Sequence, residues 1–164
     1  GNQVYQGGLL SDVTYRFFAN GYLLTTSMFC EQLNRWIAVQ CSWIRGLSKS
    51  YYKSHFVTLF KQLMDSSLIP SEQQTLARQV VDFSLAQREG YIAAYMEVFG
   101  EANCSAALKN LKGCHEHYCA QVTHIKNNRT VVGAGNEVEP VLLFFLFHSF
   151  ILLFYIFGFL MDCF

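Results

Sequence analysis

The sequence has little charge and little proline for its length. Only two of its 164 residues are proline, while charged residues make up 15% and apolar residues 52%. This composition excludes a solvated, disordered chain and indicates one modest domain or a domain with an appendage. The 12 basic residues balance the 12 acidic ones, and no basic stretch stands out. We therefore expect no nucleic acid among the partners.

Charge is also missing from the C-terminal segment. Residues 141–161 contain no charge, and 18 of these 21 residues are apolar. As a helix, this run would span roughly 30 Å, the thickness of the hydrocarbon core of a bilayer. The sequence thus predicts a transmembrane helix or a C-terminal anchor signal at 141–161, after a linker at 130–140. His148 is the ionisable residue within this run, and we interpret it as tolerated or hydrogen-bonded to a neighbouring helix.

The first 129 residues carry apolar side chains at three- and four-residue spacing, which is typical of amphipathic helices. The expected helices cover about 27–47, 52–63, 71–98 and 102–112, and helical spacing continues over 115–125. Within residues 1–26, the turn signals Gly7-Gly8 and Asn20-Gly21 bracket residues 9–19, a stretch that fits either helix or strand. The predicted fold class is therefore mainly α, with a small bundle of four or five helices in residues 1–129 followed by a single C-terminal hydrophobic or transmembrane helix.

The sequence has six cysteines, of which five precede the apolar C-terminal run and Cys163 follows it. On a helix, Cys30 and Cys41 would share a face, while Cys104 and Cys114 enclose nine residues, the spacing of a single CX9C pair. Two such helices could be joined by disulfides, so the candidate disulfide residues are Cys30, Cys41, Cys104, Cys114 and Cys119. The alternative is that these cysteines are small buried apolar residues in a reducing compartment.

Possible zinc ligands concentrate between residues 114 and 124. Cys114, His115, His117, Cys119 and His124 lie there. The paired C-x2-C or H-x3-H spacing of zinc sites is absent, so we predict no metal site. We also find no phosphate-binding glycine loop, no GxSxG or HExxH motif and no paired carboxylates on one face. The sequence therefore predicts neither catalytic residues nor a cofactor.

These features lead to two hypotheses of function. The first is a non-catalytic, membrane-anchored accessory subunit of a respiratory or ATP synthase type complex in the mitochondrial inner membrane. Its partners would be other membrane-protein subunits and the lipid bilayer, with exposed aromatics such as Trp43, Tyr51 and Tyr52 at the interface. The alternative is a disulfide-stapled binding protein at the cell surface, held by a GPI lipid or by the C-terminal helix. Its glycosylation sites would be Asn103 and Asn128, which both occur in sequons.

Overall fold

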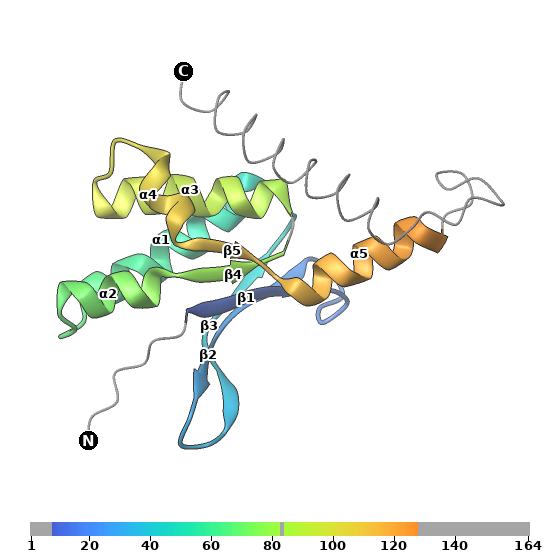
Figure 1. The fold of residues 1–164 in the computed structure, drawn as a ribbon, viewed down its shortest axis with the longest axis horizontal. Coiled ribbons are helices and arrows are strands. Elements are labelled where there is room, and N and C mark those ends of the chain that lie inside the picture. The colour runs from blue at the N-terminus through green and yellow to red at the C-terminus, as the bar shows by residue number, and fades with distance from the viewer. Residues whose placement is uncertain (1–7, 83, 128–164) are drawn as a thin grey trace. The chain divides into compact units, whose positions relative to one another are not determined.

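A mixed β-sheet lies at the centre of the fold. The computed structural model describes residues 8–82 and 84–127. Within these residues, five strands form one sheet in the order β3-β2-β1-β4-β5 (Figure 1). The strands are β1 (Leu9–Thr14), β2 (Tyr22–Cys30), β3 (Arg35–Ile44), β4 (Gln79–Val81) and β5 (Leu111–Gly113). The helices are α1 (Lys49–Met64), α2 (Pro70–Ala77), α3 (Leu85–Phe99), α4 (Cys104–Lys109) and α5 (His115–Asn127).

The chain divides into two compact units, Gly1–His117 and Tyr118–Phe164. The first unit contains the whole sheet, α1 to α4 and the first three residues of α5. The described part of the second unit is the rest of α5, up to Asn127. The core and the candidate site described below both belong to the first unit.

The fold class is α/β, so the prediction of a mainly α bundle is wrong. The region expected to be a helix over 27–47 forms the last four residues of β2 and the whole of β3. These two strands pair antiparallel from Tyr22 opposite Ile44 to Cys30 opposite Arg35. Aromatic and β-branched side chains suit a strand as well as a helix face, and pairing with β1 decides between the two. The hairpin turn includes Asn34 at a φ of 49°, a conformation that asparagine tolerates.

The predicted helix over 71–98 is also wrong, because β4 interrupts it. α2 ends at Ala77, and Arg78 takes an extended conformation that leads into β4. A new helix, α3, then begins after Ser84, whose side chain accepts a hydrogen bond from Gln87 N at 3.4 Å. Because β4 pairs on both sides, with β1 and with β5, its backbone hydrogen bonds replace those of a helix.

Helices were predicted well where the spacing is local. The helix expected over 52–63 is confirmed as part of α1, and the spacing over 115–125 is confirmed by α5. The helix expected over 102–112 is shorter, because α4 ends at Lys109 and the following residues join the sheet as β5. Gly100 ends α3 in the left-handed conformation, with a φ of 68°.

Within the described part of the chain, no helix is both long and apolar enough to cross a membrane. The predicted transmembrane helix therefore has no counterpart among α1 to α5. The segment 141–161 with His148, and the predicted linker at 130–140, lie outside the described residues.

Helices α1 and α3 pack on one face of the sheet and enclose an aromatic core. Phe56 and Phe60 of α1 both meet Tyr91 of α3 edge to face, with ring centroids 5.4 Å and 5.5 Å apart. All three residues are fully buried. Buried side chains of the strands, including Leu24 and Val81, join this cluster. Edge-to-face aromatic pairs add to the stability gained from the buried area, so the contact between α1 and α3 holds both helices against the sheet.

A line of buried polar groups crosses the same face. The imidazole of His55 in α1 contacts Thr26 Oγ1 through Nε2 at 2.8 Å and Ser42 Oγ through Nδ1 at 2.7 Å. Thr26 Oγ1 lies 2.7 Å from Ser11 Oγ, and Ser11 donates to Gln79 Oε1 at 2.8 Å. These bonds tie α1 to β3, β2, β1 and β4, and they satisfy polar groups that burial would otherwise destabilise.

Candidate metal centre

Two carboxylates meet on the face of the sheet opposite to α1 and α3. In β1, Leu9, Ser11 and Val13 are buried toward the helices, so the alternate residues, including Asp12, point to the other face. β1 and β4 are parallel neighbours with Leu10 beside Val80. Continuing this register by two residues brings Asp12 level with Asp82, just after the end of β4. Asp12 and Asp82 therefore lie side by side on one face, although they are 70 positions apart in the sequence.

His117, in the first turn of α5, is the third residue of the cluster. β5 pairs with β4 up to Val81 beside Gly113, and α5 begins two residues later at His115. This short connection places His117 Nδ1 2.7 Å from Asp82 Oδ1. The possible ligand atoms of Asp12, Asp82 and His117 all lie within 4.8 Å of one another.

The environment of Asp82 disfavours its charged form. Partial burial raises the pKa of the Asp82 carboxyl, His117 opposes this effect, and the negative charge of Asp12 adds to it. Two carboxylates this close repel each other unless a positive charge lies between them. A divalent cation would supply that charge, so the arrangement favours cation binding.

The donor set indicates which cations fit. Carboxylate oxygens suit Mg²⁺ and Mn²⁺, and an imidazole nitrogen beside them favours Mn²⁺ or Zn²⁺ over Ca²⁺. Asp12 and His117 are exposed and Asp82 is half-buried, so a substrate could reach a cation held between them. A site open on one side is typical of catalytic rather than structural metal centres.

The position of the cluster in the sheet is also typical of a functional site. From the carboxyl end of β1 the chain turns to β2 on one side, whereas from the carboxyl end of β4 it continues to β5 on the other side. In open α/β sheets, ligands bind outside the carboxyl ends of the strands, and β1 and β4 are parallel neighbours. Asp12 and Asp82 flank this divergence.

Tyr52, in the first turn of α1, is affected by the charges of the cluster. It is buried, and its pKa is raised to about 12, by burial first and then by the charges of its neighbours Tyr15, Asp82 and Asp12. A hydrogen bond with the side chain of Ser84 acts in the opposite direction. Tyr52 and Ser84 therefore join the starts of α1 and α3.

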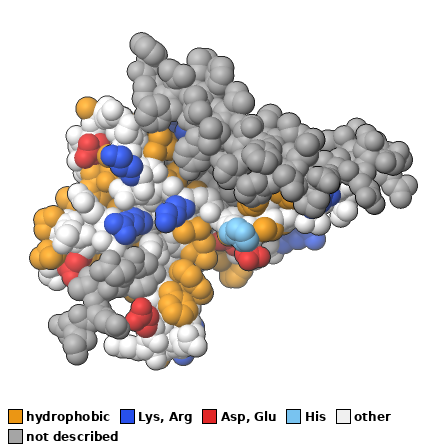
Figure 2. Space-filling view, viewed as in Figure 1, with side chains coloured by type: hydrophobic (Ala, Val, Ile, Leu, Met, Phe, Trp, Pro, Cys, Tyr) orange, Lys and Arg blue, Asp and Glu red, His pale blue; other side chains and the backbone are white. Residues whose placement is uncertain are grey.

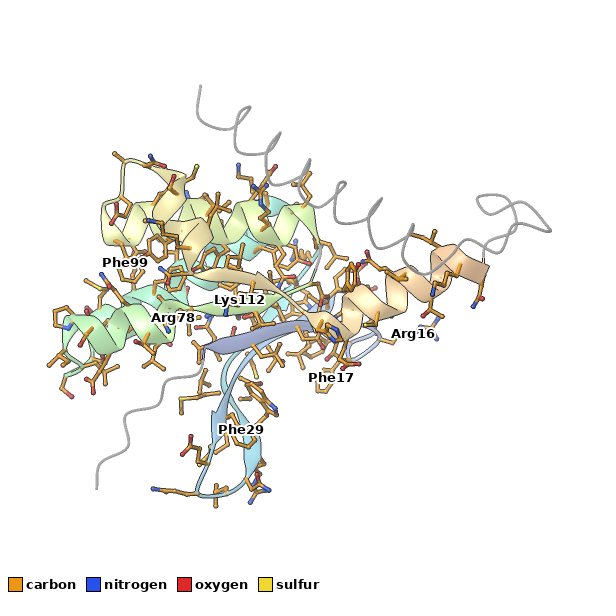
Figure 3. The ribbon with its side chains drawn as sticks, viewed as in Figure 1. Arg16, Phe17, Phe29, Arg78, Phe99 and Lys112 are labelled. Atoms are coloured by element: carbon orange, nitrogen blue, oxygen red, sulfur yellow. The ribbon has the colours of Figure 1, made fainter. Side chains whose placement is uncertain are left out.

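Basic side chains lie farther along the same sheet face. Lys112 of β5 is the register partner of Val80, and Arg78 precedes β4 by one residue, so both point to the face of Asp82. Both side chains are exposed. Figure 2 shows Lys and Arg side chains gathered on the face turned toward the viewer, and Figure 3 labels Arg78 and Lys112 there. At about 3.3 Å per residue, Arg78 lies roughly 13 Å from Asp82 along the strand.

The structure places the predicted cysteines in separate elements. No disulfide joins any two of Cys30, Cys41, Cys104, Cys114 and Cys119, so the prediction of a disulfide-stapled bundle is wrong. The prediction assumed two packed helices, whereas Cys30 and Cys41 lie in β2 and β3 and Cys104 begins the short helix α4.

The remaining predicted residues have mixed positions. Asn103 caps α4, and its Oδ1 accepts a hydrogen bond from Ser105 N at 2.7 Å. Asn128 lies outside the described residues. Among the proposed interface aromatics, Trp43 and Tyr51 are exposed, but Tyr52 is buried. Of the suspected zinc ligands, His117 does join a possible metal site, with two carboxylates as its neighbours in place of cysteines.

Sequence reasoning missed Asp12 and Asp82. Asp12 lies in an alternating stretch that was compatible with a strand, but Asp82 fell inside a predicted helix. Only the parallel pairing of β1 and β4 brings the two together. The sequence matches no protein-family profile, no curated protein and no solved structure, so the function is argued from this geometry.

Proposed function

We propose that this chain is a divalent-metal-dependent enzyme that hydrolyses phosphodiester bonds in nucleic acid. The observation that carries the proposal is the convergence of Asp12, Asp82 and His117 within 4.8 Å at the carboxyl ends of β1 and β4. Carboxylates and a histidine converging at such a position are a typical starting point for metal-assisted hydrolysis.

The residues of the cluster would have distinct roles. Asp12 and Asp82 would hold the cation from two strands, and His117 would add a nitrogen ligand from the start of α5. A cation bound there would polarise a phosphoryl oxygen and lower the pKa of a bound water. Because His117 also contacts Asp82 directly, it would fix the orientation of that carboxylate.

The charge pattern supports a phosphodiester as the substrate. The net charge of the chain is zero, but the open sheet face has the carboxylates at one end and Arg78 and Lys112 farther along. If one phosphate of a strand bound the metal ion, Arg78 and Lys112 would attract the neighbouring phosphates of that strand. The exposure of Asp12 and His117 suits an extended polymer rather than a small enclosed ligand. This proposal differs from our sequence-based expectation, which was a non-catalytic protein without a nucleic-acid partner. That expectation stays a prediction.

The proposal is tested first by metal binding to the full chain. Mn²⁺ binding should be measured by calorimetry for the parent protein and for Asp12→Asn and Asp82→Asn. Each variant should weaken Mn²⁺ binding by more than about tenfold, because even residues that only hydrogen-bond to a metal ligand contribute about tenfold to metal affinity. Asp65→Asn is the matched control, because Asp65 is exposed at the end of α1. Unchanged Mn²⁺ binding in both variants would exclude this metal centre.

Hydrolysis provides the second readout. We expect cleavage of a labelled single-stranded oligonucleotide in Mn²⁺ or Mg²⁺, abolished by EDTA and by Asp12→Asn but not by Asp65→Asn. Cleavage that survives Asp12→Asn would point to a contaminating nuclease and would count against the proposal.

A second candidate is a protein-binding subunit, which keeps part of the sequence-based hypothesis. It is favoured by the hairpin of β2 and β3, where Trp36 is 51% and Leu33 53% exposed. Trp36 meets Phe29 edge to face at 5.5 Å, so apolar groups gather on this hairpin. Under this function, Leu33→Ser would weaken association with a partner subunit, whereas Asp12→Asn would leave it unchanged.

A further inference from the structure

We infer that the loop between β1 and β2, residues Tyr15 to Phe18, is a platform on which an unpaired nucleobase of the substrate strand stacks. This inference rests on the proposed function and names the part of a nucleic acid that the site would select. It assigns a role to residues that neither the core nor the metal centre uses.

The loop exposes three aromatic rings in four consecutive residues. Tyr15 is 60%, Phe17 61% and Phe18 39% exposed. Phe17 and Phe18 meet edge to face with centroids 4.9 Å apart, and Tyr15 meets Tyr22 in the same way at 5.3 Å. Phenylalanines are usually buried, and a cluster of exposed ones indicates a binding surface.

The loop lies next to the carboxylates. Tyr15 follows the last residue of β1 and is three positions after Asp12. At about 3.3 Å per residue, three positions of extended chain span roughly 10 Å. Figure 3 labels Phe17 and Arg16 on this loop. A strand with a phosphate at the metal centre would therefore have neighbouring bases within reach of the aromatic rings.

Arg16 adds a positive charge within the aromatic cluster. Its backbone has a φ of 60°, in the left-handed region that non-glycine residues rarely adopt. Such backbone strain is often kept at binding sites. The side chain of Arg16 is exposed. Proteins that bind single-stranded nucleic acid combine cations that attract the backbone with aromatic rings that stack on bases.

The charges nearby favour a nucleobase over an apolar protein segment or a lipid surface as the occupant. Arg16 lies between Tyr15 and Phe17 in the loop, and Arg78 and Lys112 lie on the sheet face that also presents Asp12 and Asp82. A nucleic acid strand satisfies both features, because its phosphates are negative and its bases are flat and apolar on their faces. An apolar peptide would leave the cations without a partner.

The test compares how the aromatic rings of the loop affect binding of a strand with bases and of a strand without them. Binding of the full chain to a fluorescent thymidine oligonucleotide with a cleavage-resistant phosphorothioate backbone should be measured by anisotropy in Mn²⁺, together with binding to the same oligonucleotide carrying abasic sites. Phe17→Leu and Phe18→Leu should weaken binding of the thymidine strand by roughly 5- to 100-fold. The same variants should change binding of the abasic strand by less than about twofold, since its phosphates remain.

Two further variants separate stacking from other effects. Phe17→Tyr keeps an aromatic ring and should restore binding of the thymidine strand. Trp36→Leu removes an exposed ring from β3 and should leave binding of both strands unchanged. Equal losses for thymidine and abasic strands, or no loss in Phe17→Leu and Phe18→Leu, would overturn the platform.

Failure of the platform and failure of the proposed function have different signatures. The platform fails if binding does not depend on the bases, even when Asp12→Asn abolishes Mn²⁺ binding. The proposed function fails if Asp12→Asn and Asp82→Asn leave Mn²⁺ binding unchanged, whatever the aromatic variants do. A circular-dichroism melt of each variant checks that it is folded, and replacements at these exposed positions should shift the melting temperature little.

Discussion

Gly90 of α3 lies directly against Tyr52 of α1. A Cβ atom on Gly90 would lie 2.5 Å from Tyr52 Cβ and 2.9 Å from Lys53 N, closer than packed atoms approach. The two helices therefore cross where only glycine fits. Because the side chain of Tyr52 also forms a hydrogen bond with that of Ser84, this crossing helps to set the starts of α1 and α3 relative to each other.

Gly90→Ala should consequently destabilise the protein. The added methyl group would push α3 away from α1, at a cost of about 1–3 kcal/mol despite the better helix propensity of alanine. Urea unfolding followed by circular dichroism measures this change. Gly100→Ala is a useful comparison: Gly100 has no atom near its missing Cβ, so any loss there comes from its φ of 68°. A Gly90→Ala protein as stable as the parent would show that the helices can separate freely.

Stability should fall in mild acid because of His55. Gln40 Nε2, which can only donate, lies 3.1 Å from His55 Nδ1, so Nδ1 accepts and Nε2 donates to Thr26. Burial lowers the pKa of His55 from 6.5 to about 4. The unfolded chain therefore binds a proton more readily than the folded one between these values. The stability contributed by neutral His55 is fully present above about pH 6.5 and is lost as the pH falls to about 4.

The size of this effect is on the order of 3 kcal/mol, since each unit of pKa shift corresponds to about 1.4 kcal/mol. Urea unfolding between pH 4 and pH 7 should show the loss. His124→Gln, which replaces an exposed histidine in α5, should keep the same pH dependence. His55→Gln should be less stable at pH 7 and should lose most of the slope. An unchanged slope in His55→Gln would assign the acid sensitivity to other groups.

Asp82→Asn should separate stability from metal binding. The pKa of Asp82 is raised, so its ionised form is unfavourable in the folded state, above all because of burial. In EDTA at neutral pH, the neutral amide should therefore melt at a higher temperature than the parent. This gain should disappear as the pH falls below the raised pKa, where the parent Asp82 is also neutral.

Added Mn²⁺ should reverse the order. A cation that binds only the folded state raises the melting temperature of the parent, and Asp82→Asn should not respond. Asp65→Asn again serves as the control. If the parent melts at the same temperature in EDTA and in Mn²⁺ at millimolar concentration, the carboxylates do not form a metal centre.

Lys112 and Arg78 should contribute to oligonucleotide binding through charge alone. Lys112→Ala and Arg78→Ala should each weaken binding at low salt and reduce the slope of log affinity against log salt by about 1. The losses should be equal for thymidine and abasic strands. Lys61→Ala, on the exposed side of α1, should leave the slope unchanged. A slope that Lys112→Ala and Arg78→Ala leave intact would place the strand elsewhere.

The sequence predicted those elements whose signals are local. The apolar spacing in α1 and α5 depends on residues within a few turns of one another. β4 and β5 are three residues each, too short to show a period of two. Their conformation depends on pairing with distant strands, so a single sequence read locally favours helix there.

The candidate site was predicted only in part for the same reason. His117 was noticed because it lies among cysteines and histidines in one short stretch. Asp12 and Asp82 carry no shared local motif, and Asp82 was placed in a helix. Recognising Val80 and Val81 as a strand parallel to β1 would have been needed to bring the two carboxylates together.

The pairing of β1 with β4 also has a consequence for how the protein folds. β1 meets β2 across a short turn, but it can meet β4 only after the chain through β3, α1 and α2 has closed a long loop. Such non-local contacts raise the contact order and slow folding. During synthesis, the nascent chain would hold Asp12 long before Asp82 and His117 emerge, so it would acquire a binding site only near the end of sheet assembly.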